Sequence, residues 1–258
     1  MGHLFFIREA YMGYETRANR IMELLRRSGT AEVAYISTLL KVSPVTVRKD
    51  LQRMEERGLL RRTHGGAALG NGKDARDPRM DAMAQIAEVA AGQIKEGDCV
   101  IMNAGHTTLL TARKLLGRKN LTIITNSIAI ARELVQQNGI KLIFLGGEVN
   151  AEAVFTYGWD AVTQLEQYKA NKLILSASGI SCSAGLTTRH MEAADLLRKM
   201  IARTATVIAV ADDTKIGFES FYTVGDLQEV DMLITNATSA TEQELEKIRQ
   251  TGICVYGC

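Results

Sequence analysis

The chain has 258 residues, of which 46 % are hydrophobic, and a net charge of only +2, so it can fill the cores of one large or two ordinary domains. No apolar run approaches the roughly 18 residues of a membrane-spanning helix, so we expect no membrane partner. The four cysteines form no Cys-x-x-Cys pair and stand beside no histidine cluster, so we expect free thiols in a reducing cytoplasm, and neither a metal site nor a cofactor.

The charge is unevenly spread along the chain. Residues 1–69 carry 12 Lys and Arg against 7 Asp and Glu, a net +5, whereas residues 70–258 carry 19 against 22. A basic N-terminal third on a mildly acidic remainder is typical of a DNA-binding domain joined to a body that does not bind DNA. Random sampling can produce the same difference, so the charge distribution alone does not establish a DNA-binding domain and only supports the evidence from sequence motifs.

The first 15 residues give no clear structural pattern. The apolar run Leu4-Phe5-Phe6-Ile7 is too short and too weakly patterned for a secretory signal. We expect residues 1–15 to be a disordered extension, with translation starting at Met12 as an alternative.

Three helices are predicted next. Residues 17–27 and 33–40 each place apolar side chains on one face, and that of the second helix includes Leu39. Only Lys41-Val42 separates it from a third helix, whose start is marked by Ser43. Two short helices joined by so tight a connection are typical of a helix-turn-helix unit.

The third helix is the most informative element of the chain. The Ser43 hydroxyl can cap its start, and Pro44 follows where a missing N–H costs nothing. Val47, Leu51 and Met54 are spaced by four and three residues, so they share one buried face. The polar residues fall largely off that face, as in a recognition helix that enters the major groove.

A β-hairpin is predicted directly after this helix. Gly58 ends the helix, residues 59–63 form a strand, and His64-Gly65-Gly66-Ala67 forms a tight turn with a returning strand. This hairpin would be the wing of a winged helix, with basic side chains along phosphates or toward a minor groove. The residues that we predict to bind DNA are Ser43, Thr46, Arg48, Lys49, Gln52, Arg53, Arg61, Arg62 and His64.

The order of these motifs resembles a known family. The run from Val42 to Ala67, with Ser-Pro-Val-Thr-Val-Arg-Lys-Asp-Leu and Thr-His-Gly-Gly-Ala, resembles the DNA-binding domain of DeoR-type bacterial transcriptional regulators. The alternative is a charged, solvated helix followed by a glycine loop. Three elements in the same order argue for the resemblance.

The rest of the chain alternates strand and helix patterns. We place the winged helix-turn-helix domain at residues 16–69, a polar linker at 70–79 and an effector-sensing α/β domain at 80–258. Strands are expected at 98–103, 121–125, 140–145, 172–176, 206–211, 232–235 and 253–256, with helices between most of them. Such alternation predicts a mainly parallel sheet flanked by helices, with ligands bound at the carboxyl ends of the strands.

Small polar residues gather at these strand ends. Asn103-Ala104-Gly105-His106-Thr107-Thr108 combines a glycine with hydroxyls at a helix start, which suits a phosphate. Any single loop of this kind is more often a turn or a cap, but five such loops at one sheet edge favour a pocket for a small phosphorylated sugar or polyol. Lys215 would supply a cation for the phosphate, and Asp212 an acceptor for a sugar hydroxyl.

The resemblance extends over this region. The order Gly-x-Thr-Thr, Thr-Asn-Ser, Leu-Gly-Gly, Gly-Ile and Ala-Asp-x-x-Lys-x-Gly is similar to the effector domain of DeoR-type regulators, whose fold is similar to ribose-5-phosphate isomerase and which commonly respond to phosphorylated sugars. The effector-binding residues expected from the loops and the resemblance are Asn103, Gly105, His106, Thr107, Thr108, Thr125, Asn126, Gly146, Gly147, Gly179, Asp212 and Lys215.

Three positions depart from the family pattern. Asn103 stands where the family usually has Asp, His106 where it usually has Thr, and Leu197 where it often has Lys. Losing a carboxylate and a cation changes which ligand charge the pocket accepts. His106 could add a donor that titrates near neutrality, or it could be a solvated loop histidine.

The main hypothesis is a cytoplasmic DNA-binding regulator, a repressor of a carbohydrate-utilisation operon that a phosphorylated sugar or polyol releases or modulates. A homodimer or homotetramer would place two recognition helices about 34 Å apart on double-stranded operator DNA. One alternative is a sugar-phosphate isomerase with Asp212, Asp213 or Glu148 as base, although the carboxylates show no clear arrangement for proton transfer. Another is a DNA-binding protein with a non-functional pocket.

Overall fold

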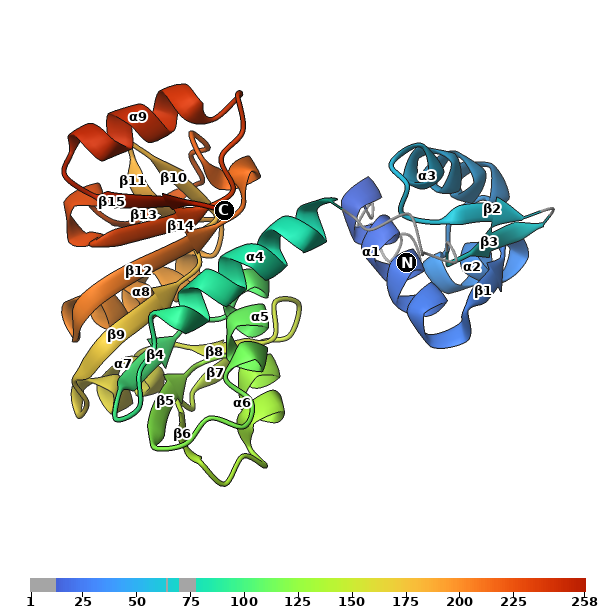
Figure 1. The fold of residues 1–258 in the computed structure, drawn as a ribbon. Helices are drawn as coiled ribbons and strands as arrows, with labels where there is room; N and C mark the ends of the chain where they lie inside the picture. Colours follow the sequence, from blue (N-terminus) through green and yellow to red (C-terminus); the bar gives the residue numbers. More distant parts are fainter. Residues whose placement is uncertain (1–12, 64, 70–77) are drawn as a thin grey trace, which may run out of the picture. The chain divides into compact units, whose positions relative to one another are not determined.

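A computed structural model describes residues 13–63, 65–69 and 78–258. The chain divides into two compact units, Met1–Pro78 and Arg79–Cys258 (Figure 1). The predictions for His64, for most of the N-terminal extension and for most of the linker lie outside the described residues.

The described residues of the N-terminal unit form three helices and a small antiparallel sheet. The helices and strands are α1 (Tyr14–Ser28), β1 (Thr30–Glu32), α2 (Val33–Leu40), α3 (Pro44–Glu56), β2 (Arg61–Thr63) and β3 (Gly66–Ala68). The sheet order is β1-β3-β2, so the predicted hairpin is present and gains a third strand that the sequence analysis did not predict. The core side chains come from all three helices and include Ile21, Ile36 and Leu51. Leu39 is 48 % exposed, so its assignment to the buried face of α2 was wrong.

Local chemistry fixes where α3 starts and how it packs. The Ser43 hydroxyl accepts the Thr46 N–H at 3.1 Å and Pro44 is the first helical residue, as predicted. On the inner side of α3, Asp50 is only 5 % exposed and accepts two hydrogen bonds from Arg17 of α1, at 2.6 and 2.9 Å. A bidentate pair of this kind fixes the orientation of α3 against α1.

The C-terminal unit is built on a seven-stranded parallel sheet of order β15-β14-β12-β9-β4-β5-β6 (Figure 1). Its strands are β4 (Cys99–Met102), β5 (Leu121–Thr125), β6 (Ile140–Phe144), β9 (Ala170–Leu175), β12 (Thr204–Ala211), β14 (Met232–Thr235) and β15 (Cys254–Gly257). The helices are α4 (Pro78–Gly92), α5 (His106–Lys114), α6 (Ile128–Leu134), α7 (Trp159–Glu166), α8 (Met191–Ala202) and α9 (Glu242–Gln250).

Side chains alternate across the central strands. In β9, Leu173 and Leu175 pack with α7, α8 and α9, whereas Ile174 packs with α4, α5 and α6. In β12, Ala209 belongs to the first cluster and Ile208 to the second. Both faces of the sheet are therefore covered, which explains why the carboxyl-terminal halves of these two strands are apolar. The predicted α/β fold with a mainly parallel, helix-flanked sheet is confirmed.

Several short antiparallel elements were not predicted. They are the hairpin β7 (Glu148–Asn150) and β8 (Phe155–Tyr157), and the sheet of β10 (Gly179–Ser181), β11 (Gly185–Thr188) and β13 (Tyr222–Gly225). The C-terminal unit also contains the 3₁₀ turns η1 (Asp213–Lys215) and η2 (Leu227–Glu229). Over the described part of the chain, every helix is too short or too polar to cross a membrane.

Candidate DNA interface and effector pocket

The outer face of α3 carries the first group of predicted DNA-binding residues. Val47, Leu51 and Met54 are buried, whereas Arg48 and Lys49 are exposed. Neither Arg48 nor Lys49 has an ion-pair partner among the described residues. Two unpaired cations near the N-terminal end of a helix suit phosphate or base contacts.

The hydroxyls at the start of α3 have a local structural role. Ser43 Oγ accepts the Thr46 N–H and lies 2.9 Å from Thr46 Oγ1. Both side chains remain accessible at the helix start, so cap formation does not exclude contact with a base edge.

Two of the predicted residues are engaged within the protein near the other end of α3. The guanidinium carbon of Arg53 lies 4.1 Å from the centre of the Tyr14 ring, a cation–π contact that attaches it to α1. Gln52 Nε2 donates to Glu56 Oε1 at 3.0 Å. Both side chains are exposed, but the structure gives each of them a partner that DNA would have to replace.

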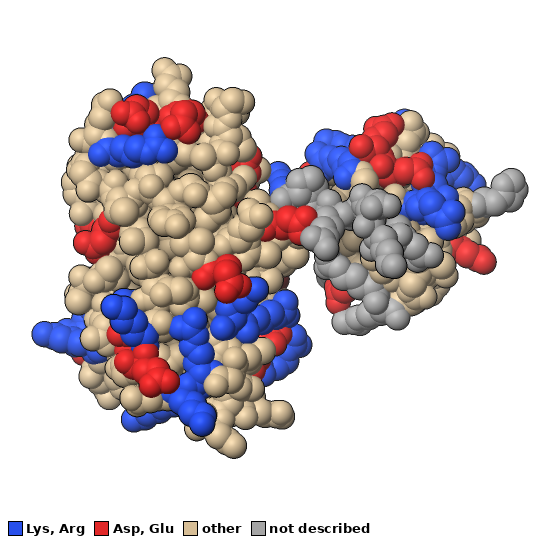
Figure 2. Space-filling view, in the orientation of Figure 1, with Lys and Arg blue, Asp and Glu red and all other residues tan. Residues whose placement is uncertain are grey.

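The hairpin is tied to α3 by one carboxylate. Arg62 donates its backbone N–H to Glu55 Oε1 at 2.6 Å, and its guanidinium lies 3.9 Å from Glu55 Oε2. Arg61 is exposed and has no ion-pair partner in the described part of the chain. In the part of this unit where α3 and β2 are drawn, Figure 2 shows Lys and Arg side chains interspersed with Asp and Glu. The predicted wing residue His64 lies outside the described residues.

A pocket of about 410 Å³ lies at the carboxyl ends of β4, β5 and β9. Five of the twelve predicted effector-binding residues line it: Asn103, Gly105, His106, Asn126 and Lys215. Gly105 precedes α5, and a Cβ at this position would lie 2.6 Å from the Ser176 Cβ. Only glycine therefore allows the loop after β4 to approach the loop after β9 so closely.

The two lining asparagines hold the pocket together. Asn103 Oδ1 accepts the Ser176 N–H and Asn103 Nδ2 donates to the Ser176 carbonyl, both at 2.8 Å. Asn126 Oδ1 accepts the Ala104 N–H at 3.2 Å, and its Nδ2 donates to the Thr156 carbonyl at 2.8 Å. Both side chains are at most 4 % exposed. Each side-chain amide thus accepts one backbone N–H and donates to one backbone carbonyl, and so joins neighbouring strand ends. Few donors or acceptors of Asn103 and Asn126 remain for a ligand.

The other predicted residues do not line the pocket, and several support it from behind. Thr108 donates to the carbonyl oxygens of Asn103 and Gly105, and Thr125 donates to that of Met102 at 2.7 Å. Asp212 caps η1 by accepting the Thr214 N–H at 3.0 Å. The predicted residues outside the lining are Thr107, Thr108, Thr125, Gly146, Gly147, Gly179 and Asp212.

Several lining residues were missed by the sequence analysis. Arg189 and His190 follow β11, and Phe155 belongs to the β7–β8 hairpin; neither β11 nor that hairpin was predicted. Ser176 and Ser178 follow β9 at the edge that the alternation pattern did identify. Leu197, noted only as a family departure, also lines the pocket.

The charge of the lining is one-sided. Its ionisable residues are His106, Arg189, His190 and Lys215, with no Asp or Glu among the residues that line it. Arg189 and Lys215 have no ion-pair partner among the residues that the structure describes. Because unpaired cations in a hollow attract anions, the lining suits an anionic ligand.

His190 differs from these two cations because a carboxylate stands behind it. Its Nδ1 lies 3.5 Å from Glu192 Oε1, and its ring packs edge-on against Phe155. The pKa of Glu192 is lowered by its own backbone N–H, by Asn150 Nδ2 at 2.6 Å and by the charge of His190, although burial opposes the shift. Glu192 therefore remains ionised at neutral pH and places a negative charge beside the His190 ring.

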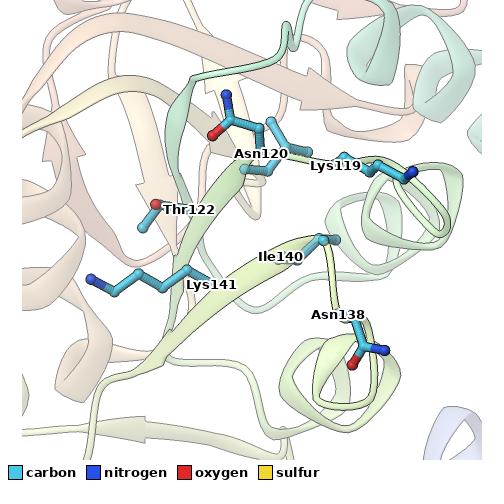
Figure 3. A pocket seen from close by; sticks show the side chains of 8 residues that line it. Lys119, Asn120, Thr122, Asn138, Ile140 and Lys141 are labelled. Carbon is cyan, nitrogen blue, oxygen red and sulfur yellow. The ribbon is translucent and has the colours of Figure 1, made fainter.

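A second hollow of about 640 Å³ lies at the opposite edge of the sheet, at the amino ends of β5 and β6 (Figure 3). Its lining residues are Lys119, Asn120, Leu121, Thr122, Asn138, Gly139, Ile140 and Lys141. Figure 3 shows Lys119 and Lys141 pointing in opposite directions, so the two cations do not converge on one ligand. The smaller pocket is therefore the better candidate for an anion-binding site.

Comparison with known proteins agrees with this two-part organisation. A family model described as the DeoR-like helix-turn-helix domain matches residues 17–72, and one described as the DeoR C terminal sensor domain matches residues 79–237. The chain is 36 % identical over 232 residues to the HTH-type transcriptional repressor GlcR of Bacillus subtilis, covering 87 % of this chain and 89 % of that protein. It is 34 % identical over 246 residues to the transcriptional repressor AccR of Agrobacterium fabrum, covering 92 % and 95 %.

Two solved structures are similar at lower identity. The sorbitol operon regulator SorC of Klebsiella pneumoniae is 12 % identical with a TM-score of 0.42, over 88 % of this chain and 97 % of that one. Ribose 5-phosphate isomerase A of Methanocaldococcus jannaschii is 15 % identical with a TM-score of 0.40, over 53 % and 54 %.

The helix-turn-helix unit and the matched sensor domain define a DNA-binding transcriptional regulator rather than an enzyme. The chain belongs to the DeoR family, as the resemblance implied.

Proposed function

We propose that this regulator represses a carbohydrate-utilisation operon in the cytoplasm and is released or modulated by a phosphorylated sugar or polyol bound at the carboxyl ends of β4, β5 and β9. The observation that carries this proposal is the pocket lining, which contains no carboxylate and two cations, Arg189 and Lys215, that have no ion-pair partner among the described residues. The names of the relatives support the carbohydrate assignment, since one is the glycerol-3-phosphate regulon repressor of Escherichia coli, 29 % identical over 227 residues.

Operator DNA would contact the start of α3 and the β2–β3 hairpin. Arg48, Lys49 and Arg61 are exposed and unpaired among the described residues, so they can neutralise phosphates without breaking an existing ion pair. A homodimer or homotetramer would present two such helices to half-sites about 34 Å apart. The effector would act by binding one arrangement of the subunits more tightly than the other.

Thermal shift with paired ligands tests the effector assignment. Sugar or polyol phosphates are compared with the same compounds lacking phosphate, and the one that binds should stabilise the protein by about 2.7 kcal/mol at 100 times its dissociation constant. An effector that binds equally well without its phosphate contradicts the anionic assignment. If no phosphorylated compound binds, a pocket without effector function becomes the better hypothesis.

A further inference from the structure

Val45 occupies an unusual place for an aliphatic side chain. It is the second residue of α3 and is 59 % exposed, whereas Val47, two residues later, is completely buried. At 3.6 residues per turn, Val45 lies on the opposite side of α3 from the buried stripe of Val47, Leu51 and Met54. It is therefore at the middle of the outward face, in the first turn.

Exposure alone assigns nothing, because single apolar side chains are common on protein surfaces. Position is more informative. In a helix-turn-helix, the first turn of the recognition helix is the part that reaches base edges in the major groove. A valine there cannot donate or accept a hydrogen bond, and the C5-methyl of thymine is the apolar group that a base pair presents in that groove.

The surroundings of Val45 favour a duplex over a protein partner. Arg48 and Lys49 follow three and four residues later, so they are its neighbours on the helix surface. Both are exposed and unpaired in the described part of the chain, and they flank Val45 on either side of the outward face. This arrangement places one apolar side chain beside two cations that can neutralise phosphates of a duplex.

We propose that Val45 contacts a thymine methyl at one fixed position of each operator half-site and sets the base preference there. The inference rests on the proposed function, because it requires α3 to enter the major groove. Val45 is not among the residues predicted above to bind DNA, because those were chosen for their hydrogen-bonding or charged side chains.

The test begins by selecting high-affinity duplexes for the full-length protein from a random library. Each thymine of the selected site is then replaced by deoxyuridine, which removes only the methyl group. At one position per half-site, binding should weaken about fourfold, the factor expected for burying one methyl-sized group. The Val45→Ala protein should bind the thymine and deoxyuridine duplexes equally at that position.

Leu39→Ala is the matched control, since Leu39 is a similarly exposed aliphatic residue, 48 % exposed, on α2. This variant should keep the full thymine preference. If no duplex is selected, the proposed function fails and this inference fails with it. If a duplex is selected but no deoxyuridine weakens binding, or Val45→Ala keeps the penalty, α3 still binds DNA and only the role of Val45 is overturned.

Discussion

Replacing Asn103 by aspartate, the residue that the family resemblance implies at this position, should destabilise the C-terminal unit. Asn103 accepts the Ser176 N–H and donates to the Ser176 carbonyl, both at 2.8 Å, from a site only 4 % exposed. A carboxylate keeps the first hydrogen bond but places an oxygen against the Ser176 carbonyl oxygen. The substitution therefore exchanges a buried hydrogen bond for a buried repulsion.

The expected cost is about 2–3 kcal/mol at pH 7, since an unsatisfied buried acceptor costs about 1–3 kcal/mol and a charged one costs more. In a domain of this size, that lowers the unfolding midpoint by about 4–12 °C. A protonated carboxyl could donate to the Ser176 carbonyl as the amide does, so folding should raise the pKa of the new carboxyl above its usual value of about 3.9. The penalty is then smallest near pH 4 and grows as the pH rises through the folded-state pKa.

Calorimetric unfolding of Asn103→Asp at pH 4.5 and pH 7 measures both effects. The control is Asn138→Asp, the same chemical change at an exposed loop position, which should shift stability by less than about 0.5 kcal/mol. A variant as stable as the parent at pH 7, or one that suffers more at pH 4.5, refutes the assigned role of the amide.

Four other substitutions test separate parts of the structure. Arg48→Ala should weaken operator binding by about 1–3 kcal/mol and relax the preference for one base, as measured by gel shift, while effector binding stays unchanged. Arg189→Ala should weaken binding of the phosphorylated effector at least tenfold in calorimetric titration and leave DNA affinity without effector unaltered. Asp50→Ala should cost about 3–5 kcal/mol in denaturant unfolding of the N-terminal unit, because it removes the Asp50 carboxylate from the buried Arg17 guanidinium. Burial raises the pKa of Asp98, but its hydrogen bonds with Lys172 and a backbone N–H outweigh this effect and hold the pKa below its ordinary value. The ionised carboxylate therefore contributes stability above about pH 4, and this stability should be lost as the pH falls through the folded-state pKa. In acid unfolding, Asp98→Asn should make the stability depend less on pH over this range.

Each of these results has a contradicting outcome. Equal losses of DNA and effector binding in Arg48→Ala would mean that the two activities are not on separate units. Unchanged effector affinity in Arg189→Ala would remove that cation from the site. An Asp50→Ala protein as stable as the parent would mean that the buried pair contributes nothing, and an unchanged acid profile in Asp98→Asn would assign the acid loss to other carboxylates.

The main architecture could be predicted from sequence because its signals are local. Ser43, Pro44 and the apolar spacing of α3 specify a capped amphipathic helix without any long-range contact. The central parallel strands contain apolar runs, such as residues 173–175 of β9 and 207–211 of β12, because both faces of the sheet are covered there. The three-residue strands β7, β8 and β10 are too short to show an apolar pattern, and long-range pairing determines them.

The site could be predicted only as a location. The alternation of strands and helices identified the sheet edge at which the pocket lies, lined by Asn103, Asn126 and Lys215. The pattern could not separate residues that line the pocket from residues that only support its loops. Thr108 and Thr125 carry the same hydroxyl as a ligand-binding residue, but they donate to backbone carbonyl oxygens of Asn103 and Met102. Arg189 was missed because β11, which places it, was not recognised.

The central claim is that one protein binds duplex DNA through α3 and responds to a phosphorylated metabolite in its sensor domain. Fluorescence anisotropy of a selected operator duplex, titrated with the full-length protein with and without the sugar phosphate that stabilises it most, tests both halves in one experiment. We expect salt-dependent binding that the sugar phosphate weakens at least fivefold and the unphosphorylated sugar leaves unchanged. Failure to bind any duplex at low ionic strength, or binding that no phosphorylated compound alters, contradicts the account.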